Sequence, residues 1–142
     1  MSKHKAKVVN IKGVTFNGLT ESNHWVPMDG PEQFGGSDAA IRPKELLLLS
    51  LAGCTGSDVA SIMKKMREPF TRFEVHIDAE MTETHPKVYS SIHLTFKVWG
   101  EGIKEENVKK AIQLSSEVYC GVTAMLKDSV KITDSIEINP AE

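Results

Sequence analysis

Two cysteines, Cys54 and Cys120, are the residues of this sequence best suited to covalent chemistry. They are the only cysteines in the chain, and they lie far apart along it. A thiolate is a strong nucleophile, and two thiols that meet in a fold can form a disulfide. Most cysteines taken singly are small apolar residues. Their surroundings therefore decide between a reactive pair and two structural thiols.

Each cysteine has distinctive neighbours. Cys54 lies in the run Gly53-Cys54-Thr55-Gly56. A glycine inside a helix costs about 1 kcal/mol relative to alanine, so the pair predicts a close approach to the backbone, by a reacting group or by a crossing helix. Cys120 is expected where one helix ends and the next begins, and amide groups at a helix start favour a thiolate. A structural thiol is the alternative at that position.

The helix that carries Cys54 is predicted over residues 43–66. Proline at its first position suits a helix start, and Glu45 in the first turn suits the positive end of the helix dipole. The run Leu46 to Ala52 is apolar on every side, which is typical of a helix buried in a core or at a subunit interface. The second half has a single apolar stripe. This helix is predicted to be the centre of the molecule.

The other elements follow from alternation, turn residues and helical periodicity. In order, the pattern predicts strands over 6–12, 14–19 and 24–28, a loop over 29–41, the central helix, strands over 73–81 and 92–98, a helix from about 103 to 120, a short helix over 122–127 and a strand over 130–138. The order is βββαββααβ in a single domain spanning 1–142. It predicts an α+β fold with antiparallel sheets.

Two segments around the cysteines resemble a known family. The stretch PKELLLLSLAGCTGSDV, Pro43 to Val59, looks like the central-helix motif of the OsmC/Ohr family, and SSEVYCGV, Ser115 to Val122, is similar to its second cysteine motif. The resemblance implies an OsmC-like fold with a long buried central helix and an intertwined homodimer. It also implies a peroxidase, of the kind that acts in the oxidative stress response, in which Cys54 attacks an organic hydroperoxide and Cys120 resolves the resulting sulfenic acid.

Glu45 matches the glutamate that the Ohr branch places near its reactive sulfur. Glu45 and Cys54 are nine residues apart, which puts them on opposite faces of the helix and about 13.5 Å apart along its axis. One subunit cannot bring both together, so a Glu45 that serves a thiol must serve Cys54 of a second copy. The active site is then expected between two chains of a homodimer.

The sequence departs from the Ohr branch in its arginine. The three arginines are Arg42, Arg67 and Arg72, and none falls in the N-terminal strands, where that branch carries its thiolate-stabilising residue. Arg42 and Lys12 are the candidates to replace it. Asp58 is a further complication, because it shares a helix face with Cys54 and an ionised carboxylate there would raise the thiol pKa. We expect its carboxylate to be hydrogen-bonded elsewhere.

The composition argues against several kinds of binding partner. The 17 basic residues are offset by 19 acidic ones and form no basic tract, so nucleic acid is not expected. The basic N-terminus lacks the apolar run of a signal peptide, and the apolar run at 46–52 is too short to span a bilayer, so a cytoplasmic protein without a membrane partner is expected. No cofactor is expected. His76 and His93 are predicted to face each other across two strands without a third ligand, so no metal is expected either.

Two functions remain open. The first is a thiol peroxidase for a fatty or aromatic hydroperoxide, with a dithiol reductant and an apolar pocket lined by Leu48, Leu51 and Met125. The second is a dimeric binding protein for a small apolar or thiol-containing ligand, without peroxidase activity, which the missing arginine favours. A Cys54 pKa well below about 8.5 would support the first function. A hydrolase lacks support because the sequence has no G-x-S-x-G motif.

Overall fold

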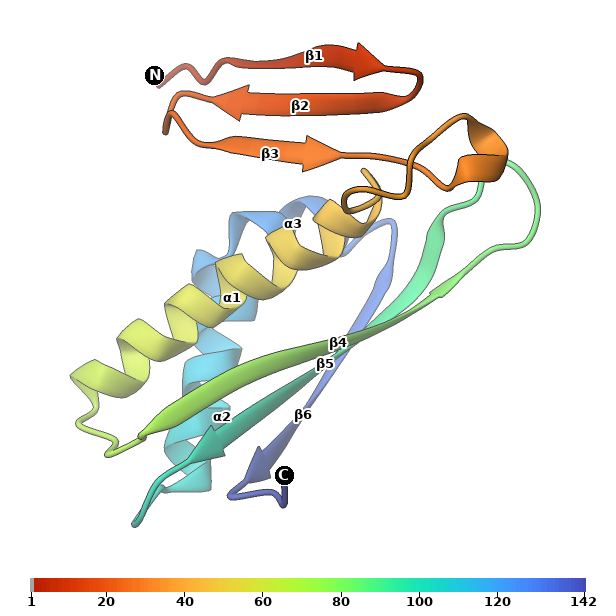
Figure 1. Cartoon of the computed structure of the whole chain (residues 1–142). Coiled ribbons are helices and arrows are strands. Elements are labelled where there is room, and N and C mark those ends of the chain that lie inside the picture. The colour runs from red at the N-terminus through yellow and green to blue at the C-terminus, as the bar shows by residue number, and fades with distance from the viewer. Residues whose placement is uncertain (1) are drawn as a thin grey trace. The chain divides into compact units, whose positions relative to one another are not determined.

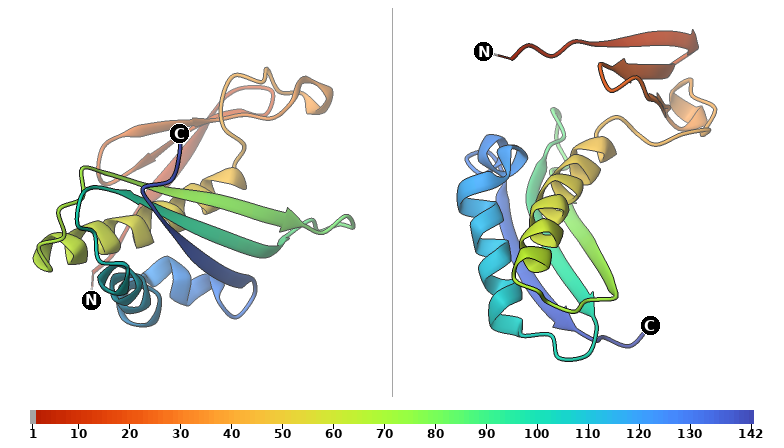
Figure 2. Two further views of the ribbon diagram at one scale, coloured as in Figure 1. Left: turned by 90° about the horizontal axis from the view of Figure 1, so that it is seen from below. Right: turned by 90° about the vertical axis from the view of Figure 1, so that its left-hand side faces the viewer.

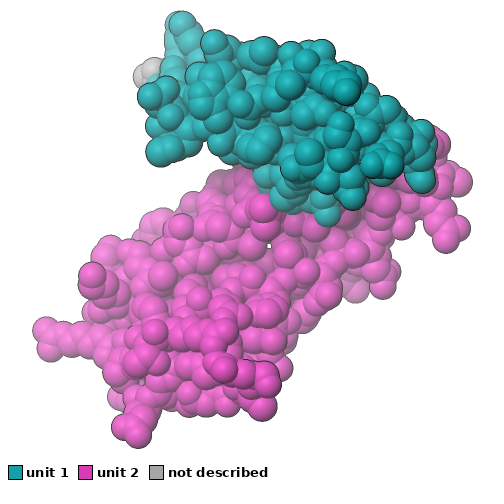
Figure 3. Space-filling model, in the orientation of Figure 1, with its two compact units in different colours: residues 1–47 teal, residues 48–142 magenta. Residues whose placement is uncertain are grey.

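The computed structural model describes residues 2–142, which form two compact units that meet within the first turn of a helix. The first unit extends to Leu47, and the second comprises residues 48–142 (Figure 3). The two cysteines, Cys54 and Cys120, both belong to the second unit.

The first unit is an antiparallel three-stranded sheet followed by a loop. Its strands are β1 (Ala6–Lys12), β2 (Thr15–Thr20) and β3 (Trp25–Met28), in that order across the sheet (Figure 1). The turn between β1 and β2 requires glycine at Gly13, because its φ is +53° and an added Cβ would lie 2.4 Å from the Gly35 carbonyl oxygen. The strands match the predicted ones to within a residue at each end.

A buried carboxylate organises the loop that follows β3. Asp29 is 1% exposed, and its two oxygens accept hydrogen bonds from the Thr15 hydroxyl and from the backbone N–H groups of Gly30, Ser37 and Ala39, at 2.8 to 3.1 Å. Because four donors surround one carboxylate, the segment is held in one conformation although it contains only a short 3₁₀ turn, Glu32–Phe34.

The second unit packs helices against one face of a second sheet. Helix α1 (Glu45–Lys65) contributes a buried stripe at every fourth residue, Leu51, Thr55, Val59 and Met63. The sheet contains β4 (Arg72–Met81), β5 (Tyr89–Trp99) and β6 (Lys131–Ile138). Alternate residues of β5 complete the core: Ile92, Leu94, Phe96 and Val98 are at most 4% exposed. Figures 1 and 2 show the helices and the sheet as two layers.

The connection between β5 and β6 contains three consecutive helical segments. Helix α2 (Glu105–Leu114) runs directly into a π-helical segment, η2 (Ser115–Tyr119), and after Cys120 the chain forms the short helix α3 (Gly121–Leu126). The wider π turn is closed by the hydrogen bond that the Cys120 N–H donates to the Ser115 carbonyl, 2.8 Å long. This turn places Cys120 at the start of α3.

The predicted α+β class and the βββαββααβ order are confirmed. The antiparallel expectation holds for β4 with β5 but is wrong for β6, which runs parallel to β5. The helical crossover returns the chain to the same end of the sheet, and such a crossover allows a parallel neighbour. The alternating pattern of β6 carries no information about strand direction.

Helix α1 is buried along one stripe only, so burial of its apolar first half at a subunit interface stays a prediction. Leu51 is fully buried, but Leu49 is 54% exposed, because within the second unit only one side of the helix packs on the sheet. By length and composition α1 would even qualify as a membrane-spanning helix. The buried stripe is instead typical of a core helix of a folded domain.

Candidate functional site

The structure brings the two cysteine sulfurs together. Cys54, in the middle of α1, and Cys120, before α3, are near enough that the Cys120 side chain acts directly on the Cys54 thiol, and both are free thiols. The sequence could not show that they meet. The two thiols are therefore candidates for a disulfide.

Cys120 is the more deeply placed of the two thiols. Its side chain is 3% exposed and occupies the N-cap position of α3, where its sulfur accepts a hydrogen bond from the Thr123 N–H at 3.4 Å. This confirms the prediction that the Cys120 sulfur contacts the amide groups of a helix start.

Cys54 is half-buried and experiences opposing influences. The Val122 N–H donates to its sulfur, which lowers the pKa of the thiol; burial, the neighbouring Cys120 sulfur and the negative charge of Asp58 all raise it. The net effect is a raised pKa for Cys54. Within one chain this site therefore favours the thiol over the thiolate, contrary to what the peroxidase hypothesis requires of Cys54.

A buried hydrogen-bond chain connects the two cysteine-bearing segments. The Ser115 hydroxyl donates to the Asp58 carboxylate at 2.9 Å and lies 2.8 Å from the Thr55 hydroxyl. Because Ser115 has one hydroxyl hydrogen and uses it on Asp58, Thr55 is the donor to Ser115. Thr55 and Ser115 are 2% and 0% exposed. The chain therefore ties the residues that flank Cys54 to the π turn that positions Cys120.

Ser115 and Thr55 were not expected from the sequence to be site residues. Thr55 lies inside the first cysteine motif and Ser115 begins the second. Their place in these motifs was the only sequence feature that could have pointed to them. Asp58 was identified, and the expectation that its carboxylate is hydrogen-bonded elsewhere is confirmed by its bond to Ser115. The expected sign of its effect on the Cys54 pKa is confirmed as well.

The two glycines beside Cys54 differ in their surroundings. An added Cβ at Gly56 would lie 3.3 Å from a methyl group of Val75 on β4, so a strand, and not a crossing helix, approaches there. At Gly53 no described residue comes within 4 Å of such a Cβ. No helix of the described chain therefore crosses at Gly53, whose backbone beside Cys54 is open, and approach by a reacting group there stays a prediction.

Glu45, Arg42 and Lys12 all lie in the first unit. Glu45 begins α1, and its carboxylate accepts the backbone N–H of Arg42 at 2.8 Å, as helix-capping carboxylates do. The Arg42 guanidinium pairs with the Asp38 carboxylate at 2.6 Å and donates to the Ala40 carbonyl. Lys12 is exposed at the end of β1. Their proposed roles toward a thiol stay predictions.

Two other expected arrangements are not observed. His76 pairs across the strands with Thr95, and His93 with Asp78, so the two histidines are diagonal neighbours and not opposite each other. Among the residues expected to line an apolar pocket, Leu51 cannot do so because it is fully buried in the core, whereas Met125 is 72% exposed.

The sequence of this chain is similar to those of known proteins. Residues 35–134, which include both cysteines and most of the second unit, match the sequence profile of the OsmC-like proteins. The chain belongs to the OsmC-like family. This OsmC-like chain is 37% identical to Protein YhfA of Escherichia coli K12 over 134 residues, covering 94% of the chain and 97% of that protein.

Solved structures share the OsmC-like fold over nearly the whole chain. A hypothetical protein from Aquifex aeolicus VF5 superimposes with a TM-score of 0.82 at 28% identity, covering 99% of this chain and 100% of that one. An organic hydroperoxide resistance protein OsmC from Legionella pneumophila superimposes with a TM-score of 0.72 at 16% identity, covering 96% and 98%. The second likeness concerns the fold alone.

Proposed function

We propose that this OsmC-like protein is a thiol-dependent peroxidase that reduces organic hydroperoxides in the cytoplasm as part of an oxidative stress response. The observation that carries the proposal is the proximity of the Cys54 and Cys120 sulfurs. Family membership and the named hydroperoxide resistance protein of the same fold support it.

The reaction assigns a different step to each sulfur. The Cys54 thiolate attacks one peroxide oxygen, the O–O bond breaks, and the other oxygen leaves as an alcohol after taking up a proton, so that Cys54 becomes a sulfenic acid. The Cys120 thiol then attacks the Cys54 sulfur, a disulfide forms and water leaves. An external dithiol reduces the disulfide by exchange and is itself oxidised to a disulfide.

Because the pKa of Cys54 is raised, a peroxidase still requires a group that stabilises the Cys54 thiolate. A cation near the sulfur would lower that pKa and increase the thiolate fraction. Arg42 and Lys12 are our candidates for this role. We further propose that the protein acts as a homodimer in which Glu45 of a second copy approaches Cys54, because helix geometry keeps the two residues of one chain apart.

A peroxide titration tests the function directly. Reduced protein is mixed with cumene hydroperoxide, and the remaining thiols are counted by alkylation and mass spectrometry. The expected result is the loss of two thiols per chain with stoichiometric peroxide consumption. Cys54→Ser should abolish consumption, because the nucleophile is gone.

Cys120→Ser supplies the matched comparison. It should still consume one equivalent but accumulate a Cys54 sulfenic acid, which a dimedone adduct detects, because no second thiol condenses with it. Unchanged thiols in the unmutated protein after excess hydroperoxide would contradict the proposal.

A second function is favoured by one specific observation. The raised pKa of Cys54 and the engagement of Arg42 by Asp38 suit a dimeric protein that binds a small apolar or thiol-containing ligand without turnover. The alkylation rate of Cys54 as a function of pH separates the two. A pKa above about 8.5 combined with peroxide inertness would establish the binding function in place of the peroxidase.

A further inference from the structure

Ser115 joins three segments of the second unit through its backbone and its side chain. Its N–H donates to the Ala111 carbonyl at the end of α2, and its carbonyl accepts the Cys120 N–H at 2.8 Å. Its hydroxyl belongs to the hydrogen-bond chain with Thr55 and Asp58 of α1. Ser115 is therefore bonded both to one cysteine and to residues that lie beside the other.

The side-chain bonds of Ser115 fix the π turn against α1. Ser115 is 0% exposed and Thr55 is 2% exposed, so bulk water cannot replace the bond between their hydroxyls. A buried hydroxyl that loses its partner is costly. A shift of the turn along α1 would break the bonds to Thr55 and Asp58 together. The chain therefore favours one position of the turn relative to α1.

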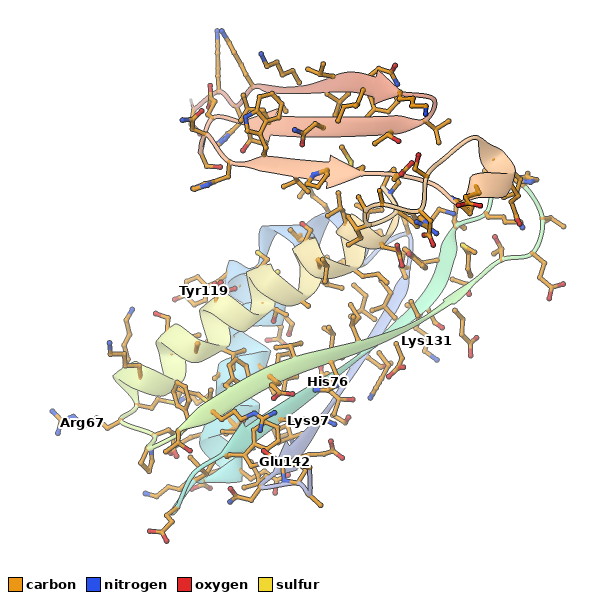
Figure 4. All side chains as sticks on the ribbon, viewed as in Figure 1. Arg67, His76, Lys97, Tyr119, Lys131 and Glu142 are labelled. Atoms are coloured by element: carbon orange, nitrogen blue, oxygen red, sulfur yellow. The ribbon has the colours of Figure 1, made fainter. Side chains whose placement is uncertain are left out.

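The same turn determines where the Cys120 sulfur lies. π turns are rare in proteins and occur frequently at functional sites. Segment η2 ends at Tyr119, which Figure 4 labels beside α1, and Cys120 follows directly. The Cys120 sulfur then accepts the Thr123 N–H at the start of α3. The position of this sulfur thus depends on the turn that Ser115 closes with its carbonyl and holds with its hydroxyl.

We infer that Ser115 is a positioning residue for the resolution step, because its hydrogen bonds to α1 hold Cys120 within reach of the Cys54 sulfenic acid. The inference rests on the proposed function, since resolution requires that this sulfenic acid has formed. In that step the Cys120 sulfur bonds to the Cys54 sulfur and the S–O bond of the sulfenic acid breaks. The hydroxyl leaves as water with the proton of the Cys120 thiol.

Rapid-mixing kinetics separate this step from the attack on the peroxide. Reduced protein is mixed with excess cumene hydroperoxide and quenched with acid at intervals, and mass spectrometry measures the dithiol, sulfenic acid, sulfinic acid and disulfide. Ser115→Ala should slow the conversion of sulfenic acid to disulfide about tenfold, because a small misplacement of a reacting group has a large effect on rate. A larger share of the protein should then proceed to sulfinic acid.

The attack on the peroxide should change less than about twofold in Ser115→Ala. The substitution leaves the Cys54 thiol, the Val122 N–H and the Asp58 charge in place, and these are groups that act on the attacking sulfur. A merely structural role would not slow resolution alone. The ratio of the two rates is therefore the decisive measurement.

The neighbouring serine provides the matched control. The Ser116 hydroxyl donates to the Gln113 carbonyl of the preceding helix and not to α1, so Ser116→Ala should keep both rates. Thr55→Val keeps the shape of the side chain and removes one bond of the chain, and should slow resolution about threefold. It carries the test if Ser115→Ala does not fold.

Two results would overturn the inference while peroxide consumption stays intact. One is an unchanged resolution rate in folded Ser115→Ala, or in Thr55→Val where Ser115→Ala does not fold. The other is an equal slowing by Ser116→Ala. Absence of any thiol loss in the unmutated protein would overturn the proposed function and the inference with it.

Discussion

The reactivity of Cys54 is decided by a few groups around one sulfur. The Val122 N–H favours the thiolate, whereas burial, Cys120 and Asp58 oppose it, and the opposing groups prevail. Of these, the Asp58 charge is the one that a substitution can remove with little structural change. An asparagine at this position keeps an oxygen that can accept the Ser115 hydroxyl, so the hydrogen-bond chain survives.

Asp58→Asn should therefore lower the pKa of Cys54. The charge of Asp58 raises that pKa, and its removal makes the thiolate easier to form. The measurement is the alkylation rate of Cys54 against pH in a Cys120→Ser background. We expect the midpoint to move to lower pH and the rate near neutral pH to rise roughly threefold.

Asp78→Asn is the control for a general loss of negative charge. Asp78 lies on β4, where it pairs with His93 of β5, and is not among the causes of the Cys54 shift. A midpoint unchanged by Asp58→Asn, or moved equally by Asp78→Asn, would show that the Asp58 carboxylate does not act on the sulfur.

The Asp29 side chain stabilises the conformation of the loop after β3. Burial by itself would raise the pKa of Asp29, but the hydrogen bonds from Gly30, Ala39, Thr15 and Ser37 outweigh burial and lower it from the ordinary value of 3.8. A lowered folded-state pKa means that ionised Asp29 stabilises the folded loop. This contribution is complete above about pH 4 and is lost as the pH falls through the lowered value.

Asp29→Ala should loosen the loop without unfolding the second unit. The backbone N–H groups of Gly30, Ser37 and Ala39 lose their acceptor, so their hydrogen exchange at neutral pH should accelerate about tenfold or more. Glu32→Gln, an exposed change in the same loop, is the control and should leave these rates unaltered. Equal protection in Asp29→Ala and the unmutated protein would refute the anchoring role.

At the scale of the whole molecule, helix α1 exposes large apolar side chains near its start. Leu47 and Leu49 are 47% and 54% exposed, whereas the stripe of Leu51, Thr55, Val59 and Met63 on the same helix is buried. Contiguous exposed apolar surface commonly marks an interface between proteins. This agrees with our proposal of a homodimer, in which Glu45 would reach the Cys54 of the second copy.

Sedimentation equilibrium should accordingly give twice the chain mass of 15.7 kDa. Leu49→Glu should weaken self-association roughly tenfold or more, because a carboxylate would have to be buried in the interface. Val88→Glu changes a similarly exposed residue, 49%, in the β4–β5 connection and should leave the dimer intact. A monomeric mass for the unmutated protein at all concentrations would exclude the dimer.

The sequence by itself determined the element order, the fold class and the family. Strand and helix periodicities are local patterns, and both cysteine motifs are contiguous, so each could be recognised without knowing what packs against it. Glu45 at the start of α1 and Cys120 at the start of α3 were predictable for the same reason. The dimer, the thiolate-stabilising cation and the cytoplasmic location stay predictions.

Only the tertiary structure decided which groups meet. The Thr55–Ser115 and Asp58–Ser115 bonds join residues 60 and 57 positions apart, and the parallel direction of β6 depends on the path of the whole crossover. The raised pKa of Cys54 likewise results from Val122, Cys120 and burial acting together. Such long-range contacts do not produce a periodic pattern in the sequence, because they form only when separate elements pack.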